Sequence, residues 1–360
     1  MKTIKVLIIT ILLLVFVCPL RASAEEAGAE VIERFDEILD DSEAGYSYSD
    51  VSGITFGSLA DKLRERVYDG GKQPLKLLGS LLLVTVLCAV VRSTGGSFIN
   101  NADSIFNSVG VLAAVMLILP HLLELFGRAV RAVELSGSFI AVFIPVFAGI
   151  TAASGGLAAA GVYDISLLAA SELIVQLSAG YLMPIVSAST VLSVTGSVFT
   201  KSDLSGIVRL IKKLITWGMT IVMTLFTGFL TLKCTLAGKM DGAATKTARL
   251  VISGFVPVVG GAVSDAYATV RSSFDIVRGT VGTGGCIAIV LLLLPTVVQI
   301  LLMRMVMWTG SAAAELFGEN SMKKLLGSLD SGLAIAQSVL VCYGVMFVLC
   351  TGIMMRSVGG

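Results

Sequence analysis

Residues 279–303 read GTVGTGGCIAIVLLLLPTVVQILLM, a run of 25 residues without a charged side chain. A helix of about 20 apolar residues is long enough to cross the hydrocarbon core of a bilayer. This run therefore predicts a membrane-spanning helix, with Pro295 inside it. The same pattern recurs on both sides of the run, so the membrane reading extends outward along the chain.

Six further uncharged runs support an all-α, polytopic transmembrane bundle with six to eight spans. Some are longer than one span, and prolines or paired glycines interrupt them, so the number of spans stays open between these limits. Together they define a membrane domain over residues 74–360. The runs are Leu77–Val91, Ser104–Leu123, Leu135–Tyr163, Leu173–Thr200, Leu214–Leu232 and Ser331–Met355.

The overall composition excludes several classes of protein. Of the 360 residues, 55% are hydrophobic and only 14% are charged, against about 25% charged in an ordinary soluble protein. The mean hydropathy is +0.92. These values exclude a soluble globular enzyme, a disordered chain and a disulfide scaffold. The formal net charge of +1 includes a strongly acidic segment near the N-terminus, which is not the pattern of a nucleic-acid-binding protein.

The N-terminal region has the features of a secretory signal followed by an acidic head. Residues 1–24 combine two lysines, a twelve-residue apolar run and a small-x-small motif, which predicts cleavage between Ala24 and Glu25. An uncleaved anchor helix is the alternative. Residues 25–73 then form an acidic, extracytoplasmic amphipathic-helix region. Its helix serves either to dock a partner protein or to pack against its own chain.

One apolar run, Leu250–Ser264, is too short to cross and is rich in proline and glycine, which predicts a re-entrant or broken helix. Its core, FVPVVGG at 255–261, resembles FIPVFAG at 143–149. Paired broken helices in two halves of a chain are typical of transporters, although two short apolar stretches also agree by composition. The candidate channel-lining or broken-helix residues are Pro145, Gly149, Gly254, Pro257, Gly260, Gly261 and Asp265.

Ionisable and polar side chains within or beside the spans are candidates for function by default. His121 and Glu124 are three residues apart, and Glu172 and Gln176 are four apart, so each pair shares a helix face. They serve either as a proton or ion relay or in packing and at helix ends. The chain has one histidine and no phosphate-binding GxxxxGK[ST] loop, so we expect no catalytic residue, no metal site and no cofactor. Residues 202–215 are amphipathic and predict either an interfacial helix at the cytoplasmic surface or a cytoplasmic contact for a partner.

The signal, the acidic head and the glycine-rich body with GFVPVVGGAVSDAYATV (Gly254–Val270) together resemble the stage III sporulation protein AE family. The resemblance covers nearly the whole chain. It implies a non-enzymatic subunit of the secretion-like channel that joins mother cell and forespore, needed for forespore development after engulfment. It also implies a place in the mother-cell-derived membrane around the forespore, with the head outside the cytoplasm. The implied partners are other channel subunits, including a separate ATPase and a forespore-side partner.

Two functions follow from these observations. The first is the channel subunit implied by the resemblance, in contact with lipid and with other subunits, and with self-association left open. The second is a self-sufficient secondary transporter built around residues 143–149 and 255–261. A transporter moves its substrate alone in liposomes, whereas a channel subunit needs its partners.

Overall fold

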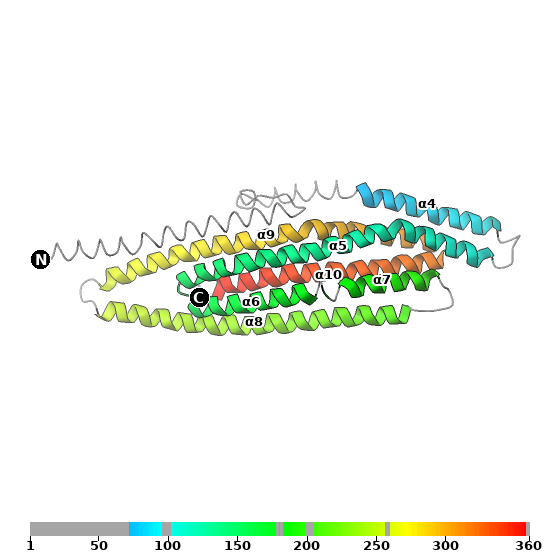
Figure 1. The fold of residues 1–360 in the computed structure, drawn as a ribbon. Coiled ribbons are helices and arrows are strands. Elements are labelled where there is room, and N and C mark those ends of the chain that lie inside the picture. Colours follow the sequence, from blue (N-terminus) through cyan, green and yellow to red (C-terminus); the bar gives the residue numbers. More distant parts are fainter. Residues whose placement is uncertain are drawn as a thin grey trace. The chain divides into compact units, whose positions relative to one another are not determined.

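The computed structural model describes residues 72–95, 102–177, 180, 183–198, 205–255 and 260–357. They belong to one compact unit, Ile54–Gly360. Within these residues the chain forms seven α-helices and no strand: α4 (Lys72–Gly95), α5 (Ala102–Ala153), α6 (Leu157–Val175), α7 (Met183–Val198), α8 (Ser205–Phe255), α9 (Gly260–Leu316) and α10 (Asn320–Ser357) (Figure 1). The predicted signal, residues 1–24, and the predicted acidic head as far as residue 71 lie outside the described residues, whereas the last two residues of the head, Lys72 and Gln73, begin α4.

Six of these helices contain a segment that is long and apolar enough to span a membrane. This confirms the prediction of an all-α polytopic bundle. The segments are Lys72–Val91, Ser108–Ala153, Leu157–Val175, Lys213–Ala244, Thr269–Leu316 and Asn320–Arg356.

Three helices are much longer than the predicted runs. α5 has 52 residues, α8 has 51 and α9 has 57, so each is about 75 to 85 Å long at 1.5 Å per residue. A bilayer core of about 30 Å needs less than half of that length. The separate runs 104–123 and 135–163 were therefore wrongly divided, because α5 continues through both as far as Ala153. Of the predicted interfacial helix over 202–215, residues 205–215 are the beginning of α8 and not a separate element.

Glycines end two of these long helices. Gly155 has a φ of +89°, and the N–H of Gly156 donates to the carbonyl of Thr151 at 3.0 Å, which is the Schellman arrangement. Gly318, with a φ of +73°, ends α9 in the same way. The predicted interruption at residues 155–156 is thus present. Pro184 lies in the first turn of α7, where its missing N–H needs no partner.

The centre of the bundle is α10, which contacts α5, α6, α7, α8 and α9. α9 and α10 form an antiparallel hairpin, in which Gly344 of α10 packs against the side chain of Leu293. α5 runs antiparallel to α9, because Phe143 packs on Gly285 and Arg128 binds Gln299.

A column of aromatic rings fills the space between α5 and α10. Phe139, Phe143 and Phe147 stack along α5 with centroids 5.6 and 5.4 Å apart. Phe347 of α10 meets the first two edge-on, and Tyr163 of α6 meets Phe147. Such pairs add stability beyond the area they bury.

The close approach of α9 to this column depends on glycine. A Cβ at Gly285 would lie 2.3 Å from the ring of Phe143, and one at Gly282 would lie 2.9 Å from Phe147 and 2.6 Å from the sulfur of Met355. A side chain at either position therefore forces the neighbouring rings to move. Small residues at helix contacts are the usual device for tight packing in membranes.

Two helices are peripheral. In the apolar segment of α8 only 12% of the residues are buried, and in that of α4 only 17% are. The corresponding share in α10 is 50%. Figure 1 shows α8 (light green) along the outside of the bundle, beside α6 and α7. The outward surface of α8 is therefore available to lipid or to other molecules.

Candidate functional site

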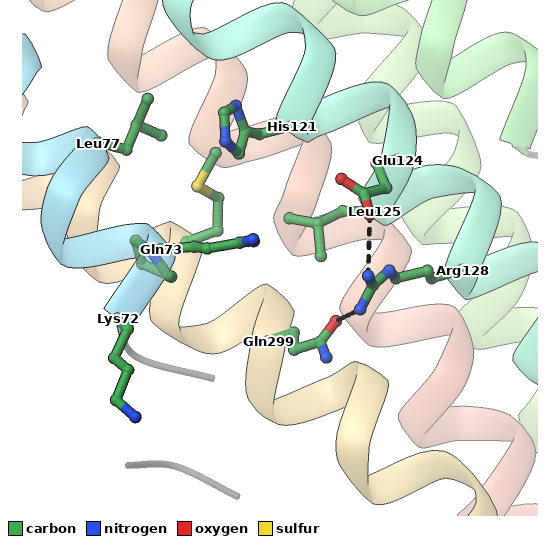
Figure 2. A pocket seen from close by; sticks show the side chains of 10 residues that line it. Lys72, Gln73, Leu77, His121, Glu124, Leu125, Arg128 and Gln299 are labelled. Carbon is green, nitrogen blue, oxygen red and sulfur yellow. Dashed lines mark hydrogen bonds and ion pairs between the residues drawn. The ribbon is translucent and has the colours of Figure 1, made fainter. Parts of the chain in front are cut away.

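A polar cavity of about 320 Å³ opens where α4, α5 and α9 meet. Figure 2 shows how side chains from the three helices surround it. The polar members are Lys72 and Gln73 from α4, His121, Glu124 and Arg128 from α5, and Gln299 from α9. The structure thus brings the predicted pair His121 and Glu124 to one cavity.

Within the cavity, Arg128 and not His121 holds the carboxylate. Arg128 donates to Oε1 of Glu124 at 2.8 Å, and a second guanidinium nitrogen donates to the amide oxygen of Gln299 at 2.8 Å (Figure 2). Nδ1 of His121 lies 3.2 Å from the carbonyl oxygen of Leu117, to which it can only donate. Arg128 therefore links α5 to α9.

A second polar cluster lies further along α9. Arg304 donates from Nε to Oδ1 of Asp330 at 2.9 Å and from Nη1 to the amide oxygen of Gln337 at 2.7 Å. The guanidinium also lies 5.4 Å from the ring of Trp308, within reach of a cation–π contact. The side chains of Arg304 and Asp330 are only 21% and 16% exposed, so this ion pair is largely removed from solvent.

We call these six side chains the polar belt: Glu124, Arg128, Gln299, Arg304, Asp330 and Gln337. The belt crosses α5, α9 and α10 between apolar stretches of the same helices. Opposite charges inside a membrane bundle pair with one another because an isolated charge there is expensive. The first cluster links α5 to α9 beside the cavity, and the second links α9 to α10.

The residues that line this cavity are suited to binding a polar solute. Among the described residues no group of three metal-ligating side chains occurs. Glu124 is engaged by Arg128, and His121 is engaged by its own helix. What the cavity offers is room for water or a small polar solute, with two cationic side chains and one carboxylate at its wall.

The second predicted pair lies elsewhere. Nε2 of Gln176 donates to Oε1 of Glu172 at 2.8 Å at the exposed C-terminal end of α6. The two side chains share a face, as predicted, but they do not line the polar cavity. They bind each other at a helix end.

The expectation of a broken helix at 143–149 is wrong. Pro145 lies inside the continuous helix α5, and a membrane helix tolerates proline when neighbouring helices satisfy the freed carbonyl. Gly149 is also within α5, with nothing within 4 Å of the position of a Cβ, so it permits no close approach. The residues of this stretch that pack closely are Phe143 and Phe147.

The other candidate break falls at the junction of two long helices. Gly254 is in the last turn of α8, and Gly260 and Gly261 begin α9, with Asp265 one turn later. Pro257 lies outside the described residues, as do Ala24 and Glu25 at the predicted cleavage site.

Sequence reasoning missed the threonines of α8. Six of them form a stripe along the apolar part of this helix, and we call it the hydroxyl face. The signal in the sequence is their spacing of three or four residues, which corresponds to one helix face. The members are Thr216, Thr220, Thr224, Thr227, Thr231 and Thr235.

Neighbouring helices leave most of the hydroxyl face uncovered. Five of its six threonines are exposed. Thr220 donates to the carbonyl of Thr216 at 2.8 Å, and Thr235 donates to that of Thr231 at 2.6 Å. Thr224 and Thr231 make the same bond, so these four hydroxyl protons return to the helix backbone and the oxygen lone pairs remain available.

Sequence reasoning also missed a helix cap. α6 begins after Gly156 without a capping side chain of its own. Instead Asp241 of α8, only 6% exposed, accepts from the N–H of Ala158 at 2.9 Å and from that of Ala159 at 2.8 Å. A carboxylate at a helix N-terminus accepts hydrogen bonds from the free N–H groups and interacts favourably with the positive end of the helix dipole. Asp241 thus joins α8 to α6.

The fold and the polar belt define a class: a multi-pass helical membrane protein with polar and ionic contacts between its helices. The family model described as Stage III sporulation protein AE matches residues 46–358, so the chain belongs to this family of sporulation proteins. The chain is 23% identical over 278 residues to Stage III sporulation protein AE of Bacillus subtilis (strain 168), which covers 76% of this chain and 69% of the relative. No solved structure matches the chain.

Proposed function

We propose that this protein is a non-enzymatic membrane subunit of a channel, related to secretion complexes, that links mother cell and forespore and supports forespore development after engulfment. Membership of the sporulation family supports the biological setting. In this proposal the protein lies in the mother-cell-derived membrane around the forespore, with its N-terminal head outside the cytoplasm. It works with other subunits, among them an ATPase that supplies energy, which agrees with the lack of a phosphate-binding loop in this sequence.

The observation that carries the proposal is the hydroxyl face of α8. It lies on a helix that is apolar enough to span a membrane. Only 12% of the residues in the apolar segment of this helix are buried against the rest of the protein. A separate exposed stripe on the same helix, with Leu214, Leu225 and Leu232, is suited to lipid. The threonines give the helix a second outward surface that can be wetted, and a polar conduit or a neighbouring subunit uses such a surface.

Cysteine accessibility tests this assignment in sporulating cells. The native cysteines are first replaced by alanine or serine, and then Thr220→Cys is compared with Leu225→Cys. Both positions are exposed on α8, but they lie on its different faces. We expect a membrane-impermeant thiol reagent to label Thr220→Cys and to impair forespore development, while Leu225→Cys stays unlabelled. Equal labelling of the two variants, or none of either, contradicts a wetted hydroxyl face.

Association with partners is tested by purification. The tagged protein is isolated in mild detergent from sporulating cells after crosslinking through Thr220→Cys, with Leu225→Cys as the matched control. We expect other sporulation membrane proteins to be linked to the first variant and not to the second. A protein recovered without partners contradicts the subunit role.

A self-sufficient transporter is the second candidate, and the polar cavity at Arg128 is the observation that favours it. Its other premise is weaker, because residues 143–149 are not a broken half-helix. Flux of a solute through liposomes that contain the purified chain alone distinguishes the two functions: a transporter gives flux, and a subunit does not.

A further inference from the structure

A second cavity, of about 620 Å³, lies between the C-terminal part of α8 and the last turn of α10. Lys239 and Lys246 of α8 and Arg356 of α10 line it, together with Thr231 and Thr235 from the end of the hydroxyl face. Its volume is within the range of small-molecule sites, about 300 to 1,000 Å³. It is separate from the polar cavity at Arg128.

Within the described residues, the lining of this cavity is basic and contains no acidic side chain. Among the described side chains, no ion pair involves Lys239, Lys246 or Arg356. Asp241 lies between the two lysines in sequence, but both of its carboxylate oxygens accept from the N-terminus of α6, on another side of α8. Three cations therefore converge on one space with no carboxylate among its lining residues.

The donors suit a phosphate group. An arginine presents a planar fork of N–H groups that matches phosphate oxygens, and a lysine presents three more donors on a flexible stem. The hydroxyl protons of Thr231 and Thr235 are already donated to backbone carbonyls. The three cationic side chains thus provide the binding capacity of the cavity.

The surface beside the cavity is apolar. Leu232, Leu236 and Met240 are 66%, 62% and 67% exposed. Leu232 and Leu236 lie seven residues before the lining residues Lys239 and Ala243, respectively, which places each pair on nearly the same face of α8, about two turns apart. A head group in the cavity would leave its acyl chains against this surface.

We propose that this cavity binds a phosphate-bearing anion and that its source is the head group of an acidic phospholipid. Basic pockets between membrane helices bind such head groups by the same combination of charge and apolar contact. The inference concerns a lipid site on the protein and does not depend on the channel role.

Lipid binding to the purified, delipidated full-length chain in detergent tests the proposal. The probes are phosphatidylglycerol, phosphatidylcholine and inorganic phosphate, and the readouts are bound lipid by native mass spectrometry and the midpoint of thermal unfolding. We expect phosphatidylglycerol to bind and to raise the midpoint, whereas phosphatidylcholine does neither. The triple variant Lys239→Gln, Lys246→Gln, Arg356→Gln should bind phosphatidylglycerol on the order of 100-fold more weakly.

Matched variants separate the site from a general effect of charge. Removing three basic residues elsewhere, with Lys213→Gln, Lys323→Gln and Lys324→Gln, should leave phosphatidylglycerol binding unchanged. If the triple variant fails to fold, Lys246→Gln alone should weaken binding about fivefold.

Two results overturn the proposal: equal binding of both lipids, or undiminished binding of phosphatidylglycerol by the pocket variants. If inorganic phosphate binds as tightly as phosphatidylglycerol and is lost in the same variants, the phosphate chemistry is supported and the lipid source is overturned.

Discussion

Replacing Arg304 should destabilise the protein far more than removing Arg304 and Asp330 together. Arg304→Gln deletes two charge-assisted hydrogen bonds, of 2.9 Å to Asp330 and 2.7 Å to Gln337, and it leaves a carboxylate that is 16% exposed without its cation. Breaking one partner of a buried ion pair costs about 3 to 5 kcal/mol. In the double variant Arg304→Gln, Asp330→Asn, neutral amides replace both charges, so no ion is left unpaired.

The coupling energy between Arg304 and Asp330 shows whether their charges stabilise the protein more than a neutral hydrogen bond would. Hydrogen bonds between neutral side chains in membrane bundles give coupling energies of about 0.6 kcal/mol, with a maximum of about 1.7. A largely enclosed ion pair should exceed this range, and we expect a coupling of about 2 to 3 kcal/mol between Arg304 and Asp330. The pair also joins α9 to α10 at the central hairpin of the bundle.

The assay is a double-mutant cycle on the purified protein. The free energy of unfolding is measured for the parent, the two single variants and the double variant by titrating mixed micelles with sodium dodecyl sulfate. Glu315→Gln, which removes the exposed ion pair with Lys323, is the control and should cost less than about 1 kcal/mol. A coupling below about 0.6 kcal/mol would refute the reasoning, because it would mean that water screens the pair.

Three further predictions concern single sites, each measured as the free energy of unfolding in the same assay. Gly285→Ala places a Cβ 2.3 Å from an aromatic ring and should destabilise the protein by about 1 to 3 kcal/mol. Gly284→Ala, with nothing within 4 Å of the new Cβ, is the control and should be neutral or slightly stabilising. Equal effects of the two variants would contradict the close packing of α9. Gly155→Ala forces a side chain into a φ of +89° and should cost about 1 to 2 kcal/mol; no loss would mean that the turn is not built as described. Asp241→Asn keeps one acceptor for α6 but loses the charge, so it should cost about 1 to 2 kcal/mol, and Asp241→Ala should cost more; the reverse order would refute the capping role.

The fold class could be predicted because membrane solvation acts on local composition. A run such as 279–303 is too apolar for a segment exposed to water. The helices that are apolar enough to span a membrane contain these runs. The lengths of the helices could not be predicted in this way. Charged residues between two runs indicate a loop when they face solvent, but Arg128 lies inside α5 because Glu124 and Gln299 satisfy it.

Proline gave the clearest misreading. The sequence shows that Pro145 cannot donate a backbone hydrogen bond, but it does not show which neighbouring helix supports the backbone around it. Here Phe143 and Phe147, on either side, pack into the glycines of α9, and α5 continues. The sequence signal for that packing is Gly282 and Gly285, which is visible only after the partner helix is known.

Local pairs of the site were predictable, and distant pairs were not. Gln176 and Glu172 bind each other because a helix brings residues four apart together. Arg304 and Asp330, or Asp241 and the N-terminus of α6, meet only through the topology of the bundle. The spacing of the threonines was readable, but the exposure of the hydroxyl face depends on which side of α8 packs.

The capping of α6 by α8 also has a consequence for biosynthesis. Asp241 is 83 residues after Ala158, and at about 5 to 20 residues per second the ribosome needs about 4 to 17 seconds to add them. During this interval α6 has been made, but its first N–H groups have not yet met their carboxylate. The N-terminus of α6 is therefore capped by a helix that is translated later. Insertion of this protein must pass through a stage in which α6 has been synthesised but its N-terminus is not yet capped by α8.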